Sequence, residues 1–360
     1  MPDRTPTIGA GVAGGRAFRL GFLLHLDRDI PPDAAYREAI ELFVAAEQLG
    51  YDSGWVIQRH FRQGNEHIAS PLVVLAAIAA HTRRIRLGTG VLVLPLEDPL
   101  RVAEDAATLD ALSAGRLELG VGSGPFAGAW KAFGRKLSDR HSLYSESVRR
   151  LHAVLDGAPV NDLDEVLHPS GAGVRERLWQ ATTSDPTHAH PAAQAAARAG
   201  DGLQLSRATA WQGGTTADAQ RHQAEIIESY RQAWAHTERA PRVQVSRAVY
   251  PHPDRREAIR RVTPGVLRWQ SWTTSGAVPS PGSVEEYLHN DRALVGPSEE
   301  LAAQLADDPA LRNATDLLVS FVPGVPDHDE HLRLLEAAAR EIAPALGWHA
   351  ASETLAAACT

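Results

Sequence analysis

The sequence predicts a (β/α)8 barrel, in which eight parallel strands are each followed by a helix. Three observations lead to this prediction: strand segments that are apolar on both faces, helical segments between them, and a count of eight strands along the chain. Strands that are apolar throughout are typical of parallel sheets covered by helices. A barrel of this kind needs about 250 residues, so the 360-residue chain must place its excess in insertions.

The clearest unit lies at 85–124 and alternates strand, helix and strand. Its first strand, Ile85–Leu94, is nearly all apolar and rich in β-branched residues. Asp98 can cap the following helix, and Pro99 fits the first helical turn. The second strand, Leu117–Val121, ends in a glycine-rich turn. Two buried parallel strands joined by a helix form a βαβ unit, the repeating element of the barrel.

The other elements follow the same alternation. The remaining strands are expected at Arg19–Leu26, Asp52–Ile57, Leu178–Thr182, Gly202–Ser206, Val243–Tyr250 and Thr315–Val322. The remaining helices are expected at Ala34–Leu49, Pro71–His81, Arg140–Asp156, Pro186–Ala199, Ala217–His236 and Asp329–Ile342. The helix Pro71–His81 is apolar almost all round, which indicates burial and favours a place at a subunit interface.

The main insertion is expected after the seventh strand, between Pro251 and Pro297. A long irregular segment at this place is typical of a lid or binding loop. Trp269 and Trp272 are candidates for lid packing or contact with a substrate, and simple packing within the insertion is an equal alternative. The expected domain organisation is a flexible lead-in, one barrel domain and a C-terminal tail, at residues 1–18, 19–346 and 347–360 respectively.

Charge, cysteine content and hydropathy exclude several classes of function for this chain. The formal charge is -8 and the sequence has no basic block, which argues against nucleic acid as the main partner. The single cysteine, Cys359, excludes a disulfide framework within the chain and suits a reducing compartment. No segment approaches the roughly 18 apolar residues of a membrane span. We therefore expect a cytoplasmic protein without membrane contact.

Candidate functional residues follow from the barrel geometry, because function gathers at the carboxyl ends of the strands. His60 is the leading candidate, since imidazole moves protons near neutral pH. A structural histidine at a loop start is the alternative for His60. His25 is a similar but weaker candidate, expected near the substrate or lid, and Asp27 also lies at the end of the first strand. The spacing of histidines and carboxylates along the sequence predicts no metal site.

Two segments could bind a phosphate. Ser123 lies between glycines, so that backbone N–H groups there can approach an anion closely. Thr183 and Ser184 precede a helix, whose first N–H groups favour an anion. Capping of that helix is the alternative explanation for these hydroxyls. The glycine-rich run lacks the full dinucleotide fingerprint, and a hydrolase Gly-x-Ser-x-Gly motif is absent.

The sequence resembles the bacterial luciferase-like flavin monooxygenase family. The resemblance rests mainly on GTGVLVLPLEDPLRVAEDAATLDALSAGRLELGVGSG, with support from YDSGWVIQRHF, LWQATTSDPTHAHPAAQAAARAGDGLQLS, VGPSEELAAQL and TDLLVSFV. It implies a barrel that binds reduced FMN, or a deazaflavin in a sister branch, at its mouth. It also implies a homodimer and a separate flavin reductase as partner.

The resemblance assigns positions for the cofactor. Gly90 and Val91 are implied to lie against the flavin ring, at a peptide bond that is often cis in the family. The other implied cofactor residues are Gly122 and Ser123 beneath the flavin and toward its phosphate, Thr183 and Ser184 at the phosphate, and Ser206 and Arg207 near the ring.

The sequence departs from the luciferase pattern at one catalytic position. Luciferases end the second strand with Glu-His-His-Phe, and the first histidine is catalytic; this chain has Gln58, Arg59, His60 and Phe61. A guanidinium is not a general base at ordinary pH. We therefore expect His60 to transfer protons and Arg59 to stabilise an anion or bind the substrate. Ser123 replaces an arginine that many members use on the phosphate.

The resulting hypothesis is a monooxygenase that uses reduced FMN and O2 to oxygenate a small organic substrate. A deazaflavin-dependent dehydrogenase or reductase on the same barrel is the first alternative. A flavin-binding protein without catalysis is the second, and the altered residues 58–59 would fit it. A metal- or phosphate-dependent hydrolase is disfavoured because ligand spacing is missing.

Overall fold

The computed structural model describes residues 18–61, 66–182, 186–206, 216–273 and 283–350. In this part of the chain, eight parallel strands close into a barrel, since β8 pairs with β7 on one side and with β10 on the other. The barrel strands are β1 (Arg19–Leu24), β2 (Ser53–Val56), β3 (Arg86–Thr89), β5 (Leu117–Gly122), β6 (Leu178–Thr182), β7 (Gly202–Leu205), β8 (Val243–Pro251) and β10 (Asp316–Ser320). The predicted (β/α)8 barrel is confirmed.

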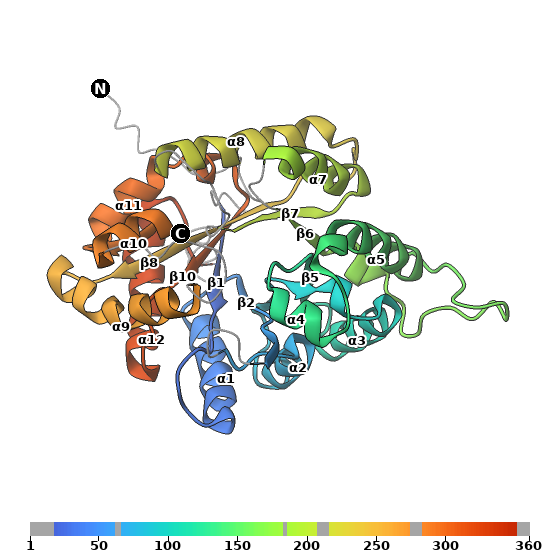
Figure 1. Ribbon diagram of the computed structural model, residues 1–360, viewed down its shortest axis with the longest axis horizontal. Helices are drawn as coiled ribbons and strands as arrows, with labels where there is room; N and C mark the ends of the chain where they lie inside the picture. The colour runs from blue at the N-terminus through green and yellow to red at the C-terminus, as the bar shows by residue number, and fades with distance from the viewer. Residues whose placement is uncertain (1–17, 62–65, 183–185, 207–215, 274–282, 351–360) are drawn as a thin grey trace, which may run out of the picture.

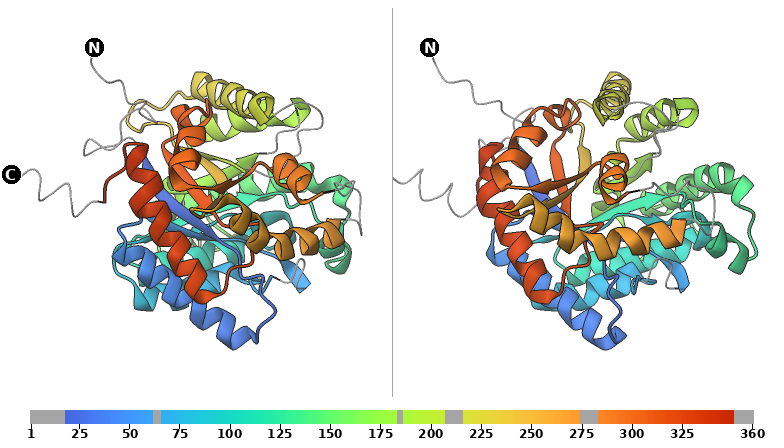
Figure 2. Two further views of the ribbon diagram at one scale, coloured as in Figure 1. Left: turned by 90° about the vertical axis from the view of Figure 1, so that its left-hand side faces the viewer. Right: turned by 60° about the vertical axis from the view of Figure 1, so that its left-hand side comes forward.

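Helices surround the barrel and cover the outer faces of its strands (Figures 1 and 2). They are α1 (Pro32–Gln48), α2 (Pro71–His81), α3 (Pro99–Leu112), α4 (Ala127–Ala132), α5 (Arg140–Leu155), α6 (Ala172–Glu176), α7 (Pro186–Ala199), α8 (Thr216–Ala233), α11 (Ser298–Ala306) and α12 (His328–Ala337). Asp98 caps α3 as expected, because its carboxylate accepts a hydrogen bond from the Leu100 N–H at 2.8 Å. Within the described residues, no helix is both long and apolar enough to cross a membrane.

The predicted strand Ile85–Leu94 is interrupted in the structure. β3 ends at Thr89, and a short strand, β4 (Leu92–Val93), follows the cis peptide bond between Gly90 and Val91. Gly88 pairs with Glu118 while Leu92 pairs with Val121, so this side holds one more residue than β5. Such an extra residue makes a bulge.

The hydroxyl of Thr89 bridges this bulge. Thr89 Oγ1 donates to the Gly120 carbonyl at 2.7 Å and accepts from the Gly120 N–H at 2.8 Å. One side chain therefore satisfies two backbone groups of β5 that a continuous ladder would otherwise pair. The prediction of one unbroken strand was wrong because apolar character alone does not reveal a bulge.

The predicted irregular insertion at 251–297 is largely regular where it is described. It forms α9 (Arg255–Thr273), α10 (Val284–Asp291) and a strand, β9 (Ala293–Gly296), that pairs with the end of β8. Ala258, Val262 and Val266 are buried at helical spacing in α9. The helical period is masked in the sequence by Pro264, which lies inside this helix. Residues 274–282 lie outside the described part of the chain.

The packed barrel also extends beyond its predicted ends. Phe18, predicted to belong to the flexible lead-in, is fully buried. Trp348, predicted to belong to the tail, is buried, and its indole N–H donates to Asp52 at 2.9 Å. Asp52 also accepts from the Leu20 N–H at 2.9 Å, so the start of the predicted tail is anchored to the base of β1.

Two tryptophans fill the interior of the barrel. Trp55 of β2 and Trp179 of β6 meet edge to face, with ring centroids 5.8 Å apart. A Cβ atom at Gly88 would lie 2.1 Å from Trp55, and one at Gly202 would lie 2.2 Å from Trp179. These glycines are therefore required, because any side chain there would displace a tryptophan.

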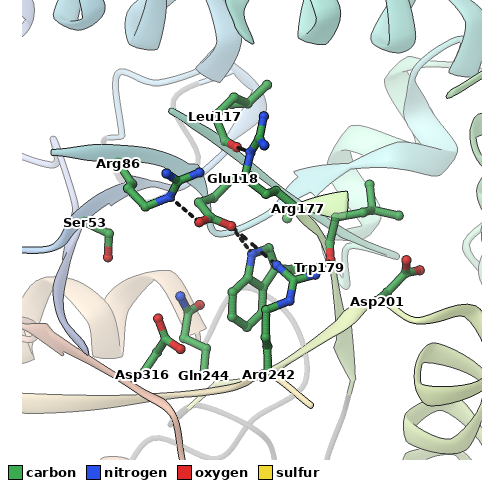
Figure 3. Close-up of polar contacts among 12 residues, drawn as sticks. Ser53, Arg86, Leu117, Glu118, Arg177, Trp179, Asp201, Arg242, Gln244 and Asp316 are labelled. Atoms are coloured by element: carbon green, nitrogen blue, oxygen red, sulfur yellow. Dashed lines mark hydrogen bonds and ion pairs between the residues drawn. The ribbon is translucent and has the colours of Figure 1, made fainter. Parts of the chain in front are cut away.

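A buried charged cluster lies at the amino ends of the strands (Figure 3). Glu118 pairs with Arg86, lies 3.7 Å from both Arg19 and Arg242, and accepts from the Trp179 indole N–H at 2.6 Å. Burial opposes ionisation of this carboxyl, but the nearby guanidinium groups outweigh it and hold the pKa of Glu118 below its ordinary value. Glu118 is therefore an anion that the surrounding cations require.

Replacing Glu118 should test this dependence. Glu118→Ala removes a buried carboxylate that three partly buried guanidinium groups share. We therefore expect the free energy of unfolding to fall by about 3 kcal/mol, the lower end of the range for a broken buried ion pair. Urea unfolding followed by circular dichroism measures this change. Glu104→Ala, in the exposed pair with Arg101, is the matched control and should change stability by less than about 1 kcal/mol. Equal losses in both variants would contradict a special role for Glu118.

Candidate active site

The structure places several predicted site residues at the carboxyl ends of the strands. His25 follows β1, Arg59 and His60 follow β2, and Ser123 follows β5. Active sites of (β/α)8 barrels form at this face. The strand ends thus bring residues that are far apart in sequence to one mouth of the barrel.

Gly90, Val91 and Gly122 come together at this mouth. The Gly90–Val91 peptide bond is cis, as the family resemblance implied. A Cβ atom at Gly122 would lie 2.6 Å from Val91 Cγ2, so glycine is needed for the valine to pack there. Gly90 itself lies against the Leu23 side chain. The ends of β3 and β5 therefore present backbone and small apolar groups, which suit the face of a planar ring.

Gln58 holds the end of β2 in place. Its side-chain carbonyl accepts from the Val93 N–H at 2.6 Å, and its amide donates to the Ala69 carbonyl at 3.1 Å and to Glu97 at 2.9 Å. A carboxylate could accept the first bond but could not donate the other two. These donated hydrogen bonds explain why position 58 is a glutamine and not the glutamate of the luciferase pattern, which the sequence alone did not reveal.

Arg59 is a cation with unused hydrogen-bonding capacity. Its guanidinium lies over the Phe126 ring at 4.3 Å and donates to the Gln58 carbonyl at 3.2 Å. Burial lowers its pKa, and the charge of Glu66 partly compensates. Its Nε is buried and has no hydrogen-bond partner among the described residues. An unsatisfied buried donor is costly, so this atom is suited to a negatively charged or electron-rich ligand.

His60 is buried beside aromatic rings. Its imidazole meets Phe133 edge to face at 4.9 Å. Burial lowers the pKa of His60, and the negative charge of Glu97 only partly opposes this. Its Nε2 is buried without a hydrogen-bond partner within the described ranges. His60 is therefore neutral near pH 7 and can accept a proton from a bound group.

Glu66 is a site residue that sequence reasoning missed. This buried carboxyl accepts from the Leu26 N–H at 2.9 Å and lies 2.6 Å from Nδ1 of His25. Burial raises its pKa to about 7, although the charge of Arg59 acts in the opposite direction. Its position a few residues after His60, in the same strand-end loop, was the available signal. Glu66 can therefore hold a proton near neutral pH.

Asp27 forms a second carboxyl next to Glu66. Arg268 of α9 pairs with it and also donates to its backbone carbonyl at 2.5 Å. Burial, and next the charge of Glu66, raise the pKa of Asp27 to about 6 despite this arginine. Trp269, a predicted lid residue, meets the His25 ring edge to face at 6.4 Å. The first turns after β1 are thus joined to α9 by charge and by aromatic contact.

A small cavity adjoins this cluster between the ends of β1 and β10. Its lining includes His25, Phe321 and His331. Burial and the neighbouring His328 lower the pKa of His331 to about 3, and its Nε2 is buried without a partner in the described structure. His331 is a neutral imidazole that the sequence pattern of α12 did not single out.

The remaining predicted cofactor residues are only partly described. Ser123 is half-buried where β5 ends. Ser206 is exposed, and its carbonyl accepts from the Gln223 amide at 2.9 Å. Three predicted residues and one predicted side chain lie outside the described part of the structure, namely Thr183, Ser184, Arg207 and the indole of Trp272. The predicted phosphate site therefore stays a prediction.

Comparison with known proteins identifies the family. The sequence matches the luciferase-like monooxygenase family over residues 19–316, and the chain belongs to that family. The oxygenating constituent of 3,6-diketocamphane monooxygenase from Pseudomonas putida, solved in complex with FMN, superposes with a TM-score of 0.71 at 19% identity, over 91% of this chain and 98% of that chain. This likeness shows the fold.

Curated relatives include a monooxygenase and an F420-dependent dehydrogenase. The 4-hydroxyprotoasukamycin monooxygenase of Streptomyces nodosus subsp. asukaensis is 40% identical over 118 residues, which are 33% of this chain and 32% of that protein. The F420-dependent glucose-6-phosphate dehydrogenase of Gordonia bronchialis is 30% identical over 198 residues, which are 51% of this chain and 56% of that protein. The chain spans about a third of the length of the first curated relatives it matches.

The raised pKa of Glu66 should appear in the pH dependence of stability. Its pKa is about 7 when folded against an ordinary 4.5, so the folded state binds the extra proton between these values. Stability therefore falls as the pH rises through this window, by roughly 2 kcal/mol between pH 5 and 7 for this group alone. In Glu66→Gln the free energy of unfolding should fall less between pH 5 and 7 than in the wild type, because the titrating carboxyl is gone.

Urea unfolding at a series of pH values measures the difference. Glu104→Gln, at an exposed carboxyl that pairs with Arg101, is the control and should follow the wild type. In Glu66→Gln, carboxyl NMR should also show the pKa of Asp27 shifting toward its ordinary value, because the neighbouring negative charge is gone. Identical pH curves for Glu66→Gln and wild type would contradict a raised pKa at Glu66.

Proposed function

We propose that this chain is a flavin-dependent monooxygenase that uses reduced FMN and O2 to oxygenate a small organic substrate in the cytoplasm. One observation carries the proposal: the apolar surface of Gly90, Val91 and Gly122 shares the barrel mouth with Arg59 and His60, whose buried Nε and Nε2 atoms lack partners in the described structure. Membership of the luciferase-like monooxygenase family supports it.

The residues at the mouth fit a flavin. Gly90, Val91 and Gly122 bring backbone and small apolar groups together, and in this proposal they lie against the face of the isoalloxazine ring. In this proposal Ser206 and Arg207 lie near the ring. Three hydroxyl residues would bind the phosphate: Ser123, Thr183 and Ser184.

A bound reduced flavin supplies the electrons that activate O2. The chain's own part is protonation, charge stabilisation and exclusion of water. His60 exchanges a proton at Nε2, because burial keeps it neutral at pH 7. The Nε–H of Arg59 stabilises negative charge in a site with little water. The pair of His25 and Glu66 stores a proton close by.

A deazaflavin-dependent dehydrogenase is the second candidate function. The F420-dependent relative aligns with about half of this chain, which favours this alternative. Such an enzyme transfers hydride without O2. A flavin-binding protein without catalysis would bind cofactor but show no turnover.

The proposal includes two protein partners. A separate reductase would supply reduced flavin, and a second copy of the chain would pack on α2. This helix buries Leu72, Leu75 and Ile78 against the barrel but leaves Val73 70% exposed. Val73, Ala77 and Ala80 are all exposed along one side of α2, and a contiguous apolar stripe of this kind is suited to a subunit contact.

Anaerobic titration with reduced FMN and with reduced F420 should separate the candidate cofactors. We expect saturable binding of reduced FMN, followed on admission of O2 by incorporation of labelled oxygen into an organic acceptor. Fluorescence quenching measures binding, and mass spectrometry detects the label. Preference for F420 with no oxygen incorporation would favour the dehydrogenase instead, and binding of neither would overturn the proposed function.

His60→Asn should lower the rate of the chemical step. Loss of a general acid–base group is expected to reduce kcat by about 100- to 1,000-fold while cofactor binding is retained. In the wild type, activity should fall as the pH drops below the lowered pKa of His60, because the protonated ring cannot accept a proton. The variant should lose this acidic limb. His81→Asn, at an exposed histidine of α2, is the control, and unchanged turnover in His60→Asn would rule out this role.

A further inference from the structure

Three metal-binding side chains converge between α7 and α8. His190 of α7 and His222 and Glu225 of α8 bring one ligand atom each within 4.8 Å of one another. His222 is buried, His190 is half-buried and Glu225 is exposed. The imidazole rings lie 5.7 Å apart at 74° to each other, so they do not stack. None of these three residues belongs to the candidate active site described above.

The two helices hold these side chains in register. α7 and α8 lie side by side on the outside of the barrel (Figures 1 and 2). His222 and Glu225 are three residues apart, which puts them on one helix face, with His222 Nδ1 3.7 Å from a Glu225 oxygen. One turn further along, the Gln194 amide donates to the Ser229 hydroxyl at 3.0 Å. This hydrogen bond joins α7 to α8 next to the cluster and holds the two helices in position there.

We propose that His190, His222 and Glu225 form a binding site for a divalent transition-metal ion of the zinc type. Two imidazoles and one carboxylate are a donor set that Zn²⁺ uses, with bonds of about 2.0–2.2 Å and a fourth position for water. Such bonds place donor atoms about 3.4 Å apart. The ligand atoms lie within 4.8 Å of one another, so no separation needs to shorten by more than about 1.4 Å. The half-buried His190 and the exposed Glu225 are the side chains with room to move.

The ion would fasten the two helices that follow β6 and β7. Because it binds the folded chain only, it would add to the stability of the folded state in proportion to its occupancy. This role is independent of the proposed function, since the site uses none of the groups assigned to flavin or substrate. Sequence spacing gave no sign of the site, because the two histidines belong to different helices.

Isothermal titration of the full chain, without a histidine tag, with Zn²⁺ alone tests the proposal. We expect one strong site per chain, weakened on the order of 100-fold in His190→Ala and in Glu225→Gln. Glu225 is exposed, so its variant should fold even if a change at buried His222 does not. Co²⁺ should give the visible absorption of a four-coordinate site in the wild type only, and Zn²⁺ should raise the melting temperature of the wild type but not of the variants.

Gln194→Ala is the matched control, because it removes the neighbouring contact between α7 and α8 and leaves the three ligands. It should bind Zn²⁺ with at most a few-fold loss. Absence of a strong site in the wild type, or equal affinity in wild type and both ligand variants, would overturn the proposal. A loss in Gln194→Ala as large as in Glu225→Gln would also overturn it, since loosened helices would then explain the effect.

Discussion

The contact between Trp55 and Trp179 is the interaction on which the rest of the barrel depends. The two rings take up the interior space that Gly88 and Gly202 leave free, so the strands close around them. The Trp179 indole also donates to Glu118, which joins the apolar filling to the buried charges beneath it. Because these side chains occupy the interior toward the amino ends of the strands, the carboxyl ends are the expected place for a ligand.

The carboxyl end of the barrel is built differently from the filled, charge-paired amino end. There the interior is formed by glycines and small apolar groups, and polar atoms are buried without partners in the described structure, as at Arg59 and His60. Buried groups of this kind reduce stability unless a ligand satisfies them. The raised pKa of Glu66 has the same origin, since its carboxyl is buried in a setting that disfavours charge. These unsatisfied groups lower the stability of the free protein, and a ligand that pairs with them would restore that stability on binding.

Sequence patterns predicted those parts of the structure that local chemistry determines. The cap at Asp98, the apolar strands and the barrel itself could be derived from the residues, and His25, Arg59 and His60 were placed at the correct end of the strands. The bulge at Thr89 and the roles of Glu66, Asp27 and Gln58 depend on contacts between segments distant in sequence. Periodicity contains no information about such contacts, and in α9 a proline concealed even the helical period.

The three hydrogen bonds of Gln58 have a consequence for how this family can vary. The Gln58 amide donates to the Glu97 carboxylate, so a glutamate at position 58, as in the luciferase pattern, would place two carboxylates in contact. Positions 58 and 97 are therefore coupled, because a carboxyl at position 58 would need either a shared proton or a different residue at position 97.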